Sequence, residues 1–119
     1  MLRSFAESHI DVEATGAFIR AAGIERAPVL MDSQAKHVAI ATGRADLFVR
    51  IPPGDYPEHI WDHAAGTLAV EEAGGLVTDL DGQTLDFSTG RRLGRNRGVI
   101  AANRHLHSRV VEILTTSKP

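Results

Sequence analysis

The feature that most constrains the fold is a strand–helix–strand pattern bounded by proline and glycine. A short apolar run, VLM at 29–31, follows Pro28 and is typical of a buried strand. Asp32-Ser33 then supplies N-cap chemistry for a helix that extends to about Thr42. The β-forming stretch DLFVRI at 46–51 follows and stops at a Pro-Pro-Gly sequence. This order favours a sheet with helices packed on it.

The remaining segments continue the alternation. Apolar residues at helical spacing predict helices, and short β-forming runs predict strands, two of which flank Asp81-Gly82 as a hairpin. The expected helices are 11–22, 60–73 and 104–115, and the expected strands are 76–80, 84–87 and 98–102. The first residues show no obvious element. We therefore expect an α/β fold, with a layered mixed or parallel sheet and flanking helices, and one domain over 1–119.

Composition excludes several classes of function. The net charge is only −2, so no overall field favours nucleic acid, and the arginine cluster from Arg91 to Arg97 has no aromatic residue for base stacking. We interpret that cluster as a solvated loop. The chain has no cysteine and no apolar segment of membrane-spanning length, so we expect a cytoplasmic protein without a membrane partner.

The segment HIWDHAAG, at 59–66, raises the question of a metal site. His59 and His63 have the four-residue spacing of zinc-binding helices. However, the residue directly after His59 is not the acid that a zinc hydrolase needs at that position as its general base. Asp62 has two interpretations, because a carboxylate in a first helical turn either compensates the helix dipole or binds a hard cation. From the residues alone the structural interpretation is favoured.

Two further positions could bind an anion. In MDSQAK, at 31–36, a helix start is combined with Ser33 and Lys36, which suits phosphate, although an ordinary cap plus a surface lysine is the commoner case. Arg50 ends a predicted strand, where arginine can bind phosphate in bidentate fashion or form a surface pair.

The longer motifs carry a family resemblance. IWDHAAGTLAVEEAGG followed by VTDLDGQTLDF resembles the C-terminal signature of the inositol-monophosphatase superfamily of metal-dependent phosphatases. Within it, MDSQAK, ADLFVR, HIWDHAAG, LDFSTGR and RGVIAAN are similar to the 3'(2'),5'-bisphosphate nucleotidases of fungi and plants. The resemblance implies hydrolysis of the 3'-phosphate of 3'-phosphoadenosine 5'-phosphate to AMP, with a sulfated nucleotide as second substrate.

The resemblance also implies roles for single side chains. Asp62 corresponds to a ligand of catalytic Mg²⁺, which reverses the interpretation from the residues alone. His59 and His63 match no ligand and are expected to have no role beyond the helix start. The side chains implied to bind the nucleotide are Ser33, Lys36, Arg50 and His9.

The chain also departs from the family pattern. Relatives carry further metal ligands upstream, including a glutamate and a D-P-x-D-G-T loop, and DLDGQT at 79–84 lacks the proline of that loop. We therefore expect the C-terminal half of a two-part phosphatase, with the N-terminal metal-loop half absent or supplied by another chain. The alternatives are an inositol-phosphate phosphatase and a truncated chain that binds nucleotide without catalysis.

Overall fold

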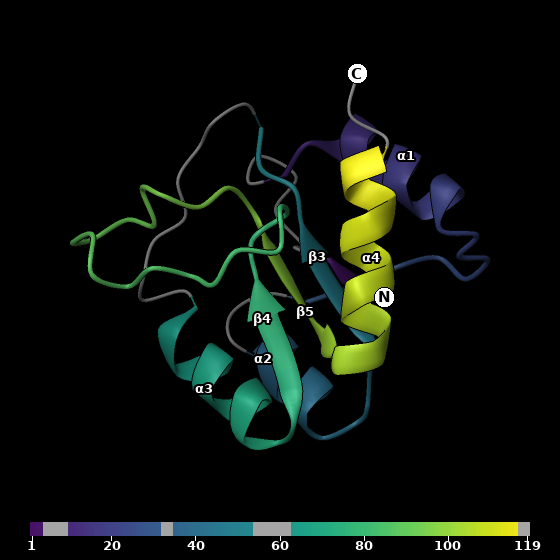
Figure 1. Ribbon diagram of the computed structural model, residues 1–119. Coiled ribbons are helices and arrows are strands. Elements are labelled where there is room, and N and C mark those ends of the chain that lie inside the picture. The colour runs from purple at the N-terminus through teal and green to yellow at the C-terminus, as the bar shows by residue number, and fades with distance from the viewer. Residues whose placement is uncertain (4–9, 32–34, 54–62, 117–119) are drawn as a thin grey trace.

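The computed structural model describes residues 1–3, 10–31, 35–53 and 63–116 as strands, helices and connecting loops (Figure 1). The expected α/β class is confirmed, since helices alternate with strands of one sheet. In chain order the elements are β1 Leu2–Arg3, α1 Val12–Ala21, β2 Val29–Leu30, α2 Ala35–Ala41, β3 Leu47–Arg50, α3 Ala64–Glu72, β4 Gly75–Thr78, β5 Val99–Asn103 and α4 Arg104–Thr116.

The sheet is mixed. Its strand order is β2-β1-β3-β5-β4. β1 pairs in parallel with β2 and β3, whereas β5 runs antiparallel to both β3 and β4. In the central pair Leu47 lies opposite Ala102 and Arg50 lies opposite Val99. Of the two expected arrangements, a mixed or a parallel sheet, the structure therefore shows the mixed one.

The two faces of this sheet carry separate apolar clusters. Because successive strand residues point to opposite faces, β3 and β5 each contribute to both clusters. One face packs against α2 and α3, and the other packs against α1 and α4 (Figure 1). The first cluster includes Phe48, Val99 and Ala101 with Ala39, Ile40 and Val70; the second includes Leu47, Val49, Ile100 and Ala102 with Phe18 and Val110.

Two strand expectations are wrong. Residues 2–3, which showed no element in the sequence, form β1 between β2 and β3. The run at 29–31 was expected to be buried, yet Val29 and Leu30 are 57% and 41% exposed. The reason is position, because β2 lies at the sheet edge and pairs on one side only, with β1.

The expected hairpin around Asp81-Gly82 forms only in part. The turn is present, with Gly82 at φ 83° and the Asp79 carboxylate accepting hydrogen bonds from the backbone N–H groups of Asp81 and Gln83. Beyond it, pairing is limited to one bridge, between Thr78 and Thr84. β4 takes β5 as its ladder partner instead.

Among the residues placed by the structure, no helix is both long and apolar enough to cross a membrane.

Candidate functional site

A cluster of basic side chains is buried where α2 and α3 begin and β3 ends. Lys36, His37, Arg50 and His63 are exposed by only 3%, 0%, 7% and 1%. Lysine and arginine are seldom buried to this degree without a partner or a function. The interpretations of Lys36 as a surface lysine and of Arg50 as a surface pair are therefore wrong.

Local sequence explains how β3 and α2 bring these groups together. Phe48 and Arg50 are two residues apart in a strand, so both point to the face that α2 and α3 cover. Lys36 and His37 are the second and third residues of α2, and this helix packs against β3. The charged end of β3 thus meets the start of α2.

The imidazole of His37 is the centre of the cluster. Its ring centroid lies 5.4 Å from that of Phe48, at 68°, and 5.4 Å from that of His63, at 64°. Its Nε2 atom lies 3.4 Å from Nδ1 of His63, a long hydrogen bond between two buried rings. The Lys36 ammonium lies 5.2 Å from the Phe48 ring centroid, within cation–π range.

Gly66 makes room for this ring. A Cβ atom at Gly66 would lie 2.3 Å from Cγ, 2.5 Å from Cβ and 2.6 Å from Nδ1 of His37. Real Cβ atoms do not approach other atoms so closely. A glycine in the first turns of α3 is therefore required by the packing of α2.

The electrostatics of the cluster keep His37 neutral. Burial, with smaller contributions from the nearby charges of His63, Lys36 and Arg50, lowers the pKa of His37 to about 3. Both cations therefore lie close enough to one imidazole to repel its proton. The result is a region of positive potential at the α2, α3 and β3 junction, which suits an anion.

The expectation that His63 has no role beyond the helix start is wrong, because His63 packs against His37. It occupies the N-cap position of α3 but makes no capping hydrogen bond through its side chain. His107 is a further buried histidine, and its Nε2 lies 2.7 Å from Thr78 Oγ1. It belongs to α4, on the opposite face of the sheet, and takes no part in the basic cluster.

The remaining sequence-predicted site residues, His9, Ser33 and Asp62, lie outside the described residues, as does His59. Within residues 1–3, 10–31, 35–53 and 63–116, no group of three or more His, Cys, Asp or Glu side chains could hold a metal. The two imidazoles of the cluster do not suit Mg²⁺, which prefers oxygen ligands. The described residues alone therefore do not fit a magnesium centre.

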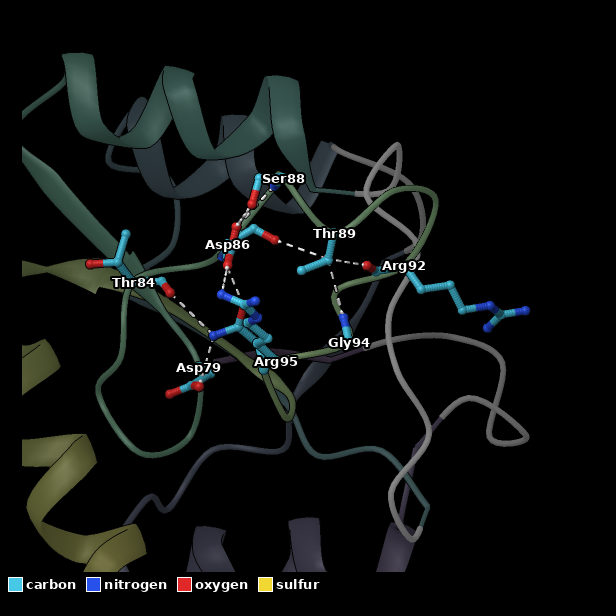
Figure 2. A network of polar contacts seen from close by, with 9 residues as sticks. Asp79, Thr84, Asp86, Ser88, Thr89, Arg92, Gly94 and Arg95 are labelled. Carbon is cyan, nitrogen blue, oxygen red and sulfur yellow. Dashed lines mark hydrogen bonds and ion pairs between the residues drawn. The ribbon is translucent and has the colours of Figure 1, made fainter.

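The arginine-rich loop is held by its own polar contacts (Figure 2). Asn96 donates through Nδ2 to the Asp79 carboxylate at 2.9 Å and to the Thr84 carbonyl at 3.1 Å. Arg95 pairs with Asp86 at 3.4 Å, although the Arg95 side chain is 77% exposed. Arg91 and Arg92 are exposed as well, which agrees with the interpretation of a solvated loop.

Comparison with known proteins agrees with the resemblance. The model of the inositol monophosphatase family matches residues 4–118. The chain is 54% identical over 90 residues to a 3'(2'),5'-bisphosphate nucleotidase of Emericella nidulans, covering 75% of this chain and 26% of that protein. It is 47% identical over 103 residues to a protein of the same name from Oryza sativa, covering 87% and 29%. The chain thus spans less than a third of the length of these curated relatives.

A solved structure shares the fold. The extragenic suppressor protein suhB from Bartonella henselae superposes with a TM-score of 0.70 at 26% identity, over 98% of this chain and 41% of that one. Sequence and structure therefore agree over nearly all of the chain, and the protein belongs to the inositol monophosphatase family.

Proposed function

We propose that this chain is the C-terminal part of a magnesium-dependent phosphatase that removes the 3'-phosphate of 3'-phosphoadenosine 5'-phosphate to give AMP, with a sulfated nucleotide as second substrate. The observation that carries the proposal is the burial of Lys36 and Arg50 beside the same neutral imidazole. The names of the relatives at 47–54% identity support the substrate class.

In this proposal Lys36 and Arg50 bind the anionic groups of the nucleotide. Arginine binds phosphate through two parallel hydrogen bonds, whereas lysine acts as a compact charge. Burial strengthens both interactions because the surroundings screen charge less than water does. Two cations at one junction suit a ligand with two phosphate groups better than a ligand with one. Ser33 and His9 are proposed to add hydrogen bonds.

Asp62 is proposed as a magnesium ligand, and the other ligands would come from a part of the enzyme outside these residues. When bound, the metal would activate water and neutralise charge on the transferring phosphoryl group. Because the described residues do not form its cage, Lys36 and Arg50 contribute binding and orientation of the nucleotide here.

A further part of the enzyme would pack against α2 and α3. Val38 on α2 and Leu68 on α3 are 51% and 60% exposed, although the two helices contact each other and cover the sheet. Exposed apolar side chains on adjacent helices are typical of a surface that another segment covers. We propose that an N-terminal half, or another chain that supplies it, lies there.

Two other functions remain as alternatives. An inositol-phosphate phosphatase would share the fold and the family, but relatives with that name among the solved structures are less similar, at 24% identity for the inositol monophosphatase of Anabaena. A chain that binds nucleotide without catalysis would agree with the absence of a carboxylate cluster among the residues the structure places.

Titration calorimetry of the 119-residue chain tests the binding proposal. We expect 3'-phosphoadenosine 5'-phosphate to bind more tightly than inositol 1-phosphate. Lys36→Gln and Arg50→Gln should each weaken nucleotide binding about tenfold or more, as for loss of a charged hydrogen bond. Arg109→Gln is the matched control, because the Arg109 side chain is 68% exposed on α4. Equal affinity in all three variants would contradict the proposal.

Phosphate release from the same nucleotide with Mg²⁺ separates the enzyme from the non-catalytic alternative. Turnover that is lost in Asp62→Asn would support the metal assignment. A folded chain that binds nucleotide without turnover would point to a catalytic centre completed by another part of the protein.

A further inference from the structure

The pair His37 and His63 joins two helices at their first turns. His37 lies in the first turn of α2, and His63 directly precedes α3, 26 residues later in the chain. Their rings meet edge to face with 3.4 Å between Nε2 and Nδ1. The contact therefore sets where α2 begins relative to where α3 begins.

Little freedom is left to the His37 ring. Gly66 of α3 lies against it so closely that no Cβ atom fits, and the Phe48 ring meets it at 68°. The ring is fully buried. A displacement of His63 would therefore be passed to His37 and, through the backbone of α2, to the adjacent Lys36.

His63 is also an unusual residue for its position. Helix N-caps favour Ser, Thr, Asp or Asn, whose oxygen accepts a hydrogen bond from the first turn. The His63 side chain makes no such bond and faces His37 instead. Its contact with α2 thus replaces the ordinary function of a side chain at this site.

We propose that His37 and His63 are positioning residues: their paired rings fix α2 against α3 and so hold Lys36 and Arg50 in the arrangement that binds phosphate. This inference rests on the proposed function, since it concerns the anion-binding role of Lys36 and Arg50. Neither imidazole touches the reacting atoms in this proposal.

The first test uses the ligand-free 119-residue chain. The Lys36 ammonium lies over the Phe48 ring, so the NMR shifts of the Lys36 methylene protons next to it report its place over that ring. His63→Leu should move these shifts towards those of an unfolded lysine. His63→Asn should keep them, because the amide of asparagine can reach the position of the imidazole Nδ1 and hydrogen-bond His37. His107→Leu, a buried histidine on the opposite face, is the control and should leave them unchanged.

The second test measures affinity for 3'-phosphoadenosine 5'-phosphate in the same variants. His63→Leu should weaken binding about tenfold, a size typical of coupling through packed side chains. His63→Asn should keep most of the affinity of the unmodified chain. His107→Leu should leave the affinity unchanged even if it lowers the melting temperature as much as His63→Leu does.

The two tests separate the proposals. If the Lys36 shifts move only in His63→Leu but the unmodified chain binds no nucleotide, the proposed function fails and the positioning role stands. If His63→Leu leaves the shifts unchanged, or His107→Leu moves them equally, the positioning role is refuted.

Discussion

Replacing Gly66 by alanine should destabilise the protein, although alanine is the better helix former. The new Cβ would lie 2.3–2.6 Å from three atoms of His37, about 1 Å closer than ordinary contact. The ring cannot swing aside, because it is fully buried between Phe48 and His63. The helices α2 and α3 would have to move apart.

The magnitude follows from two opposed terms. Forcing a methyl group into a packed core destabilises by about 1–3 kcal/mol, and a displacement near 1 Å belongs at the upper end. Gly→Ala inside a helix stabilises by about 1 kcal/mol. We therefore expect a net loss of about 2 kcal/mol in the free energy of unfolding, which corresponds to roughly 8 °C in melting temperature for a domain of this size.

Gly16→Ala is the matched control. Gly16 lies inside α1, and a Cβ atom there would meet only the Arg20 guanidinium, at 3.4 Å, so the same substitution should stabilise. Urea denaturation followed by circular dichroism measures both variants. In a His37→Ala background, Gly66→Ala should lose part of its effect, because the contacts with Cγ and Nδ1 of residue 37 are gone whereas the contact with its Cβ remains. If Gly66→Ala stabilises as Gly16→Ala does, the close packing of His37 on α3 is refuted.

Three further predictions concern buried polar groups. The pKa of His37 is lowered to about 3, so below pH 6.5 the unfolded chain binds a proton at this imidazole and the folded chain does not. The free energy of unfolding should therefore be highest above pH 6.5 and fall by about 1.4 kcal/mol per pH unit below it. His37→Phe should flatten this slope in urea titrations at pH 7.5, 6.5 and 5.5. Asp79→Asn should cost about 1–3 kcal/mol, because all three hydrogen bonds to the carboxylate need an acceptor and Asn96 would then face an amide N–H; an unchanged urea midpoint would contradict this. Thr78→Val should cost about 1–2 kcal/mol by leaving His107 Nε2 without its partner, and the loss should be smaller in a His107→Phe background, as a double-mutant cycle would show.

Elements that depend on local pattern could be predicted from the sequence. The helices α1 and α4 and the strands β3 and β5 lie within a residue or two of the expected ranges, because helical spacing and β-forming runs are local signals. β1 could not be predicted, since its two residues become a strand only by pairing with Val29 and Phe48 far along the chain. The expected strand at 84–87 is reduced to one bridge because β4 pairs with β5, a strand further along the chain, instead.

The candidate site was predictable only in part. Lys36 and Arg50 were singled out by their place at a helix start and a strand end, but their burial depends on how α2 packs against β3. The contact of His37 with His63 joins residues 26 apart in sequence, and no spacing rule predicts it. A glycine near the start of α3, Gly66, is the one local sign that another element approaches closely there.

The central pairing of β3 with β5 has a consequence for how the protein folds. Leu47 lies opposite Ala102 and Arg50 opposite Val99, so the middle of the sheet joins segments roughly fifty residues apart. Contacts of such high sequence separation slow folding, because the entropy of closing the intervening chain is lost before the strands can pair. During synthesis, α2 and α3 would emerge from the ribosome before β5 exists to complete the sheet beneath them. We therefore expect refolding on a time scale of milliseconds to seconds, with α2 and α3 exposed to non-native association until β5 is in place.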